Sequence, residues 1–232
     1  MRKMTVIKIG GEMVEKPDYF EIFLSTLRNN LPAAVVFGAG AQISARLRAK
    51  GISFEFYRGQ RVTTPAMLEL IEDEFNKTAE KIAGMLRSTK SVFVRGNEIF
   101  VCRRKSQRLG MVGEIISVKT ESVKKSFSVA ECVLVSPVGA DINGALFNVN
   151  ADVSAANLAR ALDAKKLIFC TKVGGVMDAE NNLIKTIDRK RAQELIESGV
   201  ISLGMIPKVL AALETIESRV QEVVIGETHI TA

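Results

Sequence analysis

The chain has 232 residues, of which 47% are hydrophobic and 25% are charged, so it can form one large α/β domain or two closely packed lobes. Its apolar runs are far shorter than a bilayer span and its charged N-terminus has no hydrophobic signal core, so we expect neither a membrane helix nor secretion but a cytoplasmic protein. With three cysteines, no C-x-x-C pair and one histidine, neither a disulfide framework nor a Cys/His metal site is expected.

The net charge of +6 favours anionic partners such as nucleotides or acidic proteins. The chain has two tyrosines, no tryptophan and no recognisable nucleic-acid-binding motif. We therefore do not expect it to bind nucleic acid.

The first expected strand, residues 5–9, ends beside a double glycine. Lys8 lies inside this apolar run, where an ammonium group is costly to bury without a partner. It is either an edge-strand lysine that reaches water, or a cation at the carboxyl edge of a sheet that faces anionic oxygens. In the second case Gly10 and Gly11 would let a phosphate approach bare backbone N–H groups.

A second strand, residues 33–37, follows a predicted helix at 18–30 and also runs into a glycine-containing loop. Gly38, Ala39 and Gly40 precede a predicted helix at 42–50, an arrangement that binds anions, although a tight turn also needs small residues. A dinucleotide fingerprint would have glycine at position 43, and Ile43 weakens that interpretation.

Arg61 stands just before a long predicted helix at 65–86 and is either an exposed loop arginine or a fork for a carboxylate or phosphate. Residues 91–94 and 99–102 flank Gly96-Asn97 as the strands of a hairpin do, and 109–116 is a further strand. We therefore interpret residues 91–119 as a β-rich flap. Its basic cluster is a solvated loop or a surface for an acidic partner: Arg103, Arg104, Lys105 and Arg108.

The stretch 147–178 predicts a short strand ending in Asn148-x-Asn150-Ala-Asp152, then a helix, then an apolar strand at 167–170. A strand–helix–strand unit of this kind makes a parallel sheet and places its loops at the carboxyl edge, where open α/β folds bind ligands. Asp152 and the two asparagines are thus expected to serve a site that handles phosphate. Further expected elements are a strand at 131–136, a helix at 189–198, a second helix that ends near residue 218, and a last strand at 220–225.

These segments, taken in order, resemble the amino acid kinase family and, within it, the N-acetylglutamate kinase branch. The matching stretches cover nearly the whole chain, and the NVNAD sequence is the most specific of them: residues 8–11, 38–40, 61–63, 109–114, 148–152, 171–176 and 204–208. The resemblance implies a three-layer αβα sandwich with a mainly parallel central sheet and a β-hairpin flap. It also implies an acid-substrate lobe at 1–145 and a nucleotide lobe at 146–232.

The resemblance implies a reaction as well: ATP, carrying Mg²⁺, phosphorylates a side-chain carboxylate to an acyl phosphate in arginine or lysine biosynthesis. The catalytic residues would be Lys8, Asp152 and Lys208, with the aspartate holding both lysines. The acid would be bound by Ala39, Gly40, Arg61, Asn148 and Asn150. The nucleotide would be bound by Gly10, Gly11, Lys172, Val173, Gly174, Gly175, Val176, Met177, Val200, Ile201 and Ser202. The resemblance implies no metal bound by the protein itself. It also implies that the chain forms a homodimer.

Three sites depart from the pattern of the family. Phe37 and Ala39 stand in a loop that the family builds as His-Gly-Gly-Gly, Lys172 replaces an aspartate, and Leu203 replaces a glycine or aspartate. The departures at Ala39 and Lys172 leave open a non-catalytic sensor on a kinase scaffold. The basic cluster and the net charge leave open a kinase for glutamate or α-aminoadipate linked to an acidic carrier protein.

Overall fold

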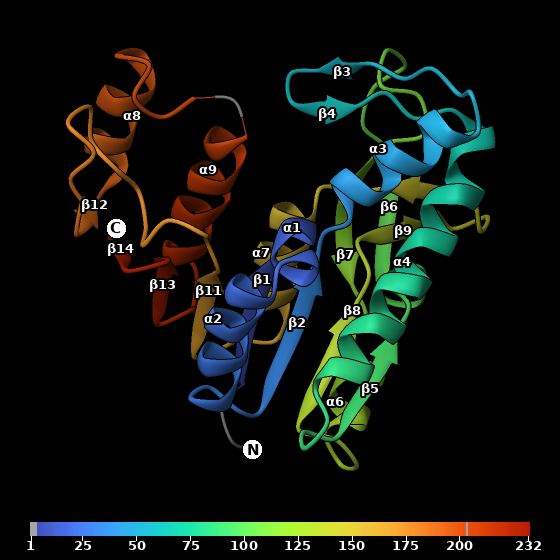
Figure 1. Ribbon diagram of the computed structural model, residues 1–232, viewed down its shortest axis with the longest axis horizontal. Coiled ribbons are helices and arrows are strands. Elements are labelled where there is room, and N and C mark those ends of the chain that lie inside the picture. The colour runs from blue at the N-terminus through green and yellow to red at the C-terminus, as the bar shows by residue number, and fades with distance from the viewer. Residues whose placement is uncertain (1–3, 203) are drawn as a thin grey trace.

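The computed structural model describes residues 4–202 and 204–232, and its centre is a sheet of eight strands (Figure 1). All neighbouring strands are parallel except β13 and β14. In spatial order the strands are β12 (Thr186–Ile187), β14 (Thr228–Ile230), β13 (Glu222–Ile225), β11 (Lys166–Phe169), β1 (Thr5–Ile9), β2 (Ala33–Phe37), β8 (Cys132–Val135) and β5 (Ser91–Val94).

The sheet is buried on both faces because its central strands are continuous apolar runs, as parallel sheets require. Every residue of β2 is buried, and its side chains alternate between two hydrophobic clusters. Ala34 and Val36 belong to one cluster, and Val35 and Phe37 to the other. The sheet is therefore the middle layer of three.

Helices form the two outer layers (Figure 1). One face is covered by α1 (Gly11–Glu15), α2 (Pro17–Arg28), α3 (Gly40–Ala49) and α4 (Pro65–Met85). The other face is covered by α6 (Glu121–Ser126), α7 (Ala151–Ala161), α8 (Arg189–Glu197) and α9 (Met205–Ile216). This confirms the αβα sandwich. In the described part of the chain, no helix combines the length and the apolar character needed to cross a bilayer.

A second, smaller sheet carries the flap. Its strand order is β10 (Leu146–Asn148), β9 (Val138–Ala140), β6 (Phe100–Arg104) and β7 (Gly113–Val118). Strands β6 and β7 form the expected antiparallel hairpin. A short separate hairpin of β3 (Phe56–Tyr57) and β4 (Gln60–Arg61) lies near it in Figure 1.

The hairpin expected around Gly96-Asn97 is wrong. Strand β5 pairs in parallel with β8 at the edge of the main sheet, and residues 96–99 form the short helix α5 (Gly96–Ile99). A Cβ at Gly96 would lie 2.0 Å from the carbonyl oxygen of Ser136, so this glycine serves a close backbone approach and not a hairpin turn. The flap therefore begins at Phe100.

The parallel unit expected between residues 145–149 and 167–170 is also wrong. Strand β10 pairs antiparallel with β9, while β11 belongs to the main sheet. The turn before β10 is fixed by Asp141, whose Oδ1 accepts hydrogen bonds from the backbone N–H groups of Asn143 and Ala145, each at 2.9 Å. The chain thus reaches α7 from the small sheet, and α7 packs on the large one.

Candidate functional site

Lys8 stands near the carboxyl end of β1, in the interior of the main sheet between β11 and β2. The edge-strand alternative is thereby excluded. The side chain of Lys8 is 12% exposed, and its Nζ lies 2.9 Å from Oδ1 of Asp152. A buried ammonium with a carboxylate partner agrees with the interpretation as a functional cation.

Asp152 comes from the first turn of α7, and a cap fixes its position. Oδ1 of Asn150 accepts hydrogen bonds from the backbone N–H of Asp152 at 2.8 Å and of Val153 at 3.1 Å. The carboxylate gains from the positive end of this helix, and it is 6% exposed. The side-chain oxygen of Asn150 is thus committed to the helix, although the residue also lines the cavity described below.

Lys208 completes a triangle of charges from the first turn of α9. Its Nζ lies 2.7 Å from Oδ1 of Asp152, the same oxygen that Lys8 contacts, and 5.2 Å from the ring centre of Phe169. Residues 8, 152 and 208 are far apart in the sequence, and the structure brings them together as the resemblance implies.

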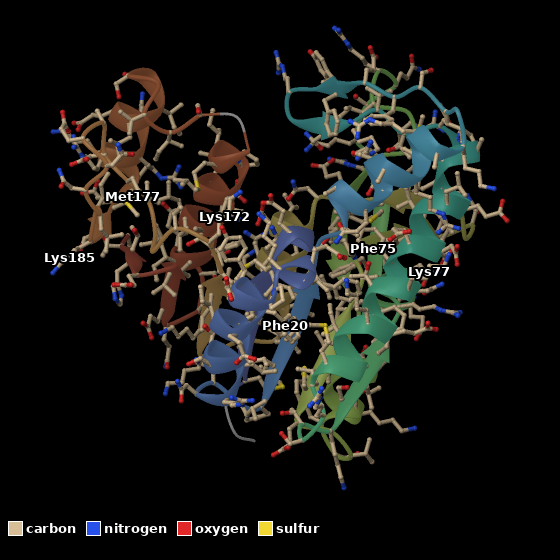
Figure 2. All side chains as sticks on the ribbon, viewed as in Figure 1. Phe20, Phe75, Lys77, Lys172, Met177 and Lys185 are labelled. Carbon is tan, nitrogen blue, oxygen red and sulfur yellow. The ribbon has the colours of Figure 1, made fainter. Side chains whose placement is uncertain are left out.

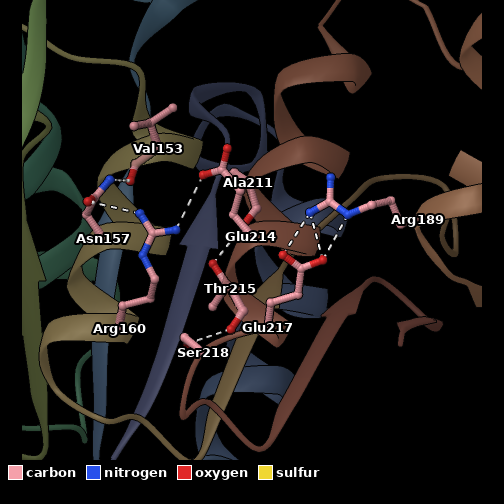
Figure 3. A network of polar contacts seen from close by, with 9 residues as sticks. All are labelled: Val153, Asn157, Arg160, Arg189, Ala211, Glu214, Thr215, Glu217 and Ser218. Carbon is pink, nitrogen blue, oxygen red and sulfur yellow. Dashed lines mark hydrogen bonds and ion pairs between the residues drawn. The ribbon is translucent and has the colours of Figure 1, made fainter. Parts of the chain in front are cut away.

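Polar contacts outside the triangle hold α9 against its neighbours (Figure 3). Arg160 of α7 pairs with Glu214 at 3.4 Å and also donates to Asn157 at 3.1 Å. Arg189 of α8 forms two hydrogen bonds with the carboxylate of Glu217, each at 2.8 Å. These contacts link α9 and the residue that ends it to α7 and α8.

Burial and mutual charge set the protonation of the triangle. Burial alone would raise the pKa of Asp152, but the attraction of Lys8 and Lys208 outweighs it and holds that pKa below its usual value. Burial, reinforced by the nearby charge of Lys8, lowers the pKa of Lys208 to about 8, against the attraction of Asp152. Near neutral pH Asp152 is therefore ionised and Lys208 is mostly protonated.

A cavity of about 250 Å³ opens beside the triangle. Lys8 and Asp152 line it together with two glycine loops, the hairpin β3–β4 and apolar side chains. Its members include Gly10, Gly11, Gly38, Ala39, Gly40, Ile43, Phe56, Gln60, Arg61, Phe75, Val112, Asn148, Asn150 and Asp152. Cations, backbone N–H groups and a helix N-terminus thus line one cavity, which suits an anionic ligand.

The two glycine loops lie against each other. A Cβ at Gly11 would be 2.4 Å from Oε1 of Gln42 and 2.8 Å from the carbonyl oxygen of Gly38, so only glycine fits there. Ala39, which departs from the pattern of the family, has φ −137° and ψ 30°, an angle that does not require glycine. Its methyl group is accommodated without a left-handed backbone.

Arg61 is 6% exposed and forms no ion pair with any carboxylate in the described ranges. One terminal nitrogen, Nη2, donates to the carbonyl oxygen of Gly40 at 3.0 Å and to Oγ of Ser44 at 2.7 Å. The other, Nη1, is buried with no hydrogen-bond partner. Burial, with the nearby charge of Arg48, lowers the pKa of Arg61. A guanidinium that lines a cavity and has no carboxylate partner suits an anionic ligand.

The other residues expected to bind the acid are placed less directly. Nδ2 of Asn148 donates to Oγ1 of Thr63 at 3.1 Å, and that hydroxyl donates to the carbonyl oxygen of Arg61 at 2.9 Å. Sequence reasoning missed Phe56, Gln60 and Phe75, which also line the cavity. The strand that holds Phe56 has two residues, too few for a periodic pattern, and the only local signal was the Arg58-Gly59 turn.

Gly10 and Gly11 line this cavity, but the other residues expected at the nucleotide lie outside it. Val176 and Ile201 are buried in the core, so their side chains are structural, and Ser202 is exposed just before α9. Glu227 N–H donates to the carbonyl oxygen of Gly174 at 2.6 Å, which ties the 171–177 loop to the turn between β13 and β14. Leu203 lies outside the described residues.

Lys172 links this loop to the first glycine loop. Its Nζ lies 2.7 Å from Oε2 of Glu12 in α1, directly after Gly10 and Gly11. In Figure 2, Lys172 lies between Met177 and the helices α1 and α2. Both side chains of the pair are about half exposed, so the contact is a weak and exchangeable one.

Comparisons with known proteins agree with this geometry. The family model described as "Amino acid kinase family" matches residues 3–227. The chain belongs to the amino acid kinase family. It is 33% identical to the acetylglutamate kinase of Endomicrobium trichonymphae over 237 residues, which cover 98% of this chain and 94% of that protein. It is 32% identical to the acetylglutamate kinase of Pelagibacter ubique (strain HTCC1062) over 228 residues, 95% of this chain and 79% of that one.

A solved structure supports the fold assignment of this family member. The chain smu.665 from Streptococcus mutans UA159 superposes with a TM-score of 0.88 at 24% identity, over 100% of both chains. At this identity the likeness concerns the fold alone.

Proposed function

We propose that the chain transfers the γ-phosphoryl group of ATP to the side-chain carboxylate of an amino-blocked acidic amino acid of the N-acetylglutamate type, in arginine biosynthesis. One observation carries this proposal: Lys8 and Lys208 share a buried carboxylate oxygen beside an anion-binding cavity. The names of the curated relatives, acetylglutamate kinase, point to the same chemistry.

The reaction needs little covalent work from the protein. An oxygen of the substrate carboxylate attacks the γ-phosphorus, and the bond from that phosphorus to the bridging oxygen breaks, so ADP leaves with the bonding electrons. A carboxylate is already ionised, so no general base is needed. The protein positions the reactants and stabilises the charge on the transferring group, and Mg²⁺ bound to ATP contributes further positive charge.

The cavity also supports a substrate whose amino group is blocked. Asp152 is the only carboxylate among the described residues that line the cavity, and it is occupied by two lysines. A free ammonium group on the substrate would find no anionic partner there and would meet the positive field of Lys8 and Arg61. A neutral amide avoids that repulsion.

The experiment is an acceptor panel with ATP and Mg²⁺ in the presence of hydroxylamine, which converts an acyl phosphate to a coloured hydroxamate. We expect product with N-acetylglutamate and none with free glutamate. Product with neither acylated glutamate nor acylated aminoadipate, free or carrier-linked, would refute the proposal.

Arg61→Lys should raise the KM for the acid substrate by roughly 10- to 100-fold, the effect of losing one charge-assisted hydrogen bond. Lysine keeps the charge but lacks the planar guanidinium group. Its single ammonium group therefore cannot make both hydrogen bonds of Nη2 and also supply a second N–H group in the place of Nη1. Steady-state kinetics with each substrate varied in turn check this. An unchanged KM for the acid would show that Arg61 is structural.

The rate should fall as the pH rises through about 8, because Lys208 then loses the proton that makes it a cation. The lysine in the unfolded chain, with its ordinary pKa of 10.5, still holds its proton in that range, so the free energy of unfolding should rise between about pH 8 and 10.5. Activity and stability therefore change in opposite directions. The pH profile of kcat/KM reports the free enzyme, and a flat profile to pH 10 would contradict the assignment.

A second candidate acceptor is glutamate or α-aminoadipate attached to an acidic carrier protein. The observation that favours it is the basic rim, the exposed Arg104, Lys105 and Arg108. Nζ of Lys105 donates to Gln60 at 3.1 Å, and Arg108 stacks on Tyr57 at 3.8 Å, so the rim contacts the hairpin that lines the cavity. Arg103 is instead paired with Glu114 at 2.7 Å.

If the acceptor is carrier-linked, Lys105→Glu with Arg108→Glu should lower kcat/KM by about tenfold at low salt, and the loss should shrink as salt rises. The kcat/KM for free N-acetylglutamate should be the same in this double variant as in the wild type. Lys125→Glu, an exposed lysine of α6 at the opposite end of the molecule in Figure 1, is the matched control. If the double variant and the Lys125→Glu control turn over the carrier-linked substrate equally at all salt concentrations, the carrier-linked acceptor is disfavoured.

Three further inferences stay predictions: a homodimer, a cytoplasmic location, and the nucleotide contacts of residues 172–177 and 200–202. The alternative of a non-catalytic sensor rested on Ala39 and Lys172. The backbone angle at Ala39 supports an intact loop, and hydroxamate formation by the wild type would dispose of that alternative.

A further inference from the structure

Two aromatic rings contact the guanidinium group of Arg61. Its central carbon lies 4.4 Å from the ring centre of Phe54 and 4.8 Å from that of Phe56. The two rings contact each other edge to face, with centres 5.9 Å apart and planes at 82°. The three side chains therefore form one unit, here called the aromatic clamp (Phe54, Phe56 and Arg61).

Packing alone does not explain an aromatic residue at position 56. The side chain of Phe56 is 56% exposed, although it lines the cavity. A phenylalanine buried for its hydrophobic area would lose most of that exposure on folding. What Phe56 gains in this position is the contact between its ring and a buried cation.

The aromatic clamp also stabilises the positive charge of Arg61. Arg61 is almost fully buried and has no carboxylate partner in the described part of the chain, so its charge must be stabilised in another way. Aromatic faces attract a guanidinium group through their quadrupole and use none of its N–H groups. A carboxylate partner would occupy those N–H groups and would compete with an anionic substrate.

We propose that Phe54 and Phe56 are positioning residues for the acid substrate: they hold the Arg61 cation at the cavity wall without a carboxylate partner that would compete with the substrate. This inference rests on the proposed function for the identity of the anion. The contacts themselves do not depend on it. Nη2 donates to Gly40 and Ser44, the two rings lie beside the central carbon of the group, and Nη1 is buried without a hydrogen-bond partner.

The kinetic test uses Phe54→Leu and Phe56→Leu, which keep an apolar side chain but remove the ring. Each should raise the KM for the acid by roughly three- to thirty-fold, while kcat and the KM for ATP stay within about twofold. Phe56→Tyr, which keeps an aromatic ring at this position, should have the wild-type KM for the acid. Tyr57→Leu is the matched control, because this ring of the same hairpin contacts Arg58 and Arg108 instead.

A second readout does not need activity. Phenylglyoxal modifies accessible arginines, and peptide mass spectrometry locates the product at Arg61. Both leucine variants should label Arg61 faster than the wild type and the Tyr57→Leu control do. Unchanged labelling together with an unchanged KM in Phe56→Leu, an exposed position where unfolding is not expected, would overturn the clamp. If the wild type phosphorylates no acylated acid but the leucine variants still expose Arg61, the proposed function fails and the clamp stands.

Discussion

Lys8→Met and Lys208→Met are each expected to lower kcat by about 10²- to 10³-fold, the usual cost of removing one preorganised charge-stabilising group. Each ammonium group lies within 3 Å of the same oxygen, at 2.9 and 2.7 Å, so both are held at one point beside the cavity. The charge that develops on the transferring phosphoryl group needs both cations. Methionine keeps the length of the side chain and removes the charge.

Rapid-quench single-turnover kinetics on the purified variants measure this loss directly. Lys77→Met is the matched control, because Lys77 points outward from α4 while Phe75 on the same helix faces the interior (Figure 2). It should keep wild-type turnover. The assignment would be wrong if Lys8→Met and Lys208→Met retained more than about a tenth of the wild-type rate while fully folded.

Asp152→Asn is expected to reduce turnover by a similar factor and also to destabilise the fold by about 3–5 kcal/mol, as the removal of one partner from a buried ion pair does. An amide cannot neutralise the two ammonium groups that now meet at Oδ1. Repulsion between Lys8 and Lys208 would then displace at least one of them from the cavity. The variant thus loses both the alignment of the lysines and part of the folding free energy.

Urea unfolding at pH 7 and pH 9 separates the two effects of this substitution. The deficit in unfolding free energy should be smaller at pH 9, because Lys208 in the wild type, with its lowered pKa of about 8, is then largely neutral and the ion pair that the variant lacks has lost one cation. Asp73→Asn is the control, since Asp73 forms its pairs with Arg46 and Lys77 at the surface and is 46% exposed. A variant as stable and as active as the wild type would show that the triangle is wrongly assigned.

The parts of the site that the sequence predicted are those where local pattern and chemistry coincide. Lys8 interrupts an apolar strand next to two glycines, which the fold alone would not favour. Asp152 follows a helix-capping asparagine, and that pattern predicts the start of a helix. Lys208 breaks no local pattern, and only the resemblance to a family assigned it. The main sheet was predictable because its central strands are short continuous apolar runs, the pattern of strands that are buried on both faces.

Long-range pairing explains what the sequence did not predict. An apolar run of four residues pairs equally well in a hairpin or in a parallel sheet, and the contact of Gly96 with the backbone of Ser136 decides the outcome for β5. Strand β10 has three residues, and its partner β9 was not predicted at all. Phe54 and Phe56 acquire a function only through Arg61, which the fold brings to them.

The most direct test of the account compares ATP-dependent hydroxamate formation from N-acetylglutamate by the wild type and by Lys8→Met, with folding of both verified by circular dichroism. The account predicts hydroxamate with the wild type and a loss of about 10²-fold or more in the folded variant. Equal product from both proteins would contradict the claim that the cluster of Lys8, Asp152 and Lys208 transfers the phosphoryl group.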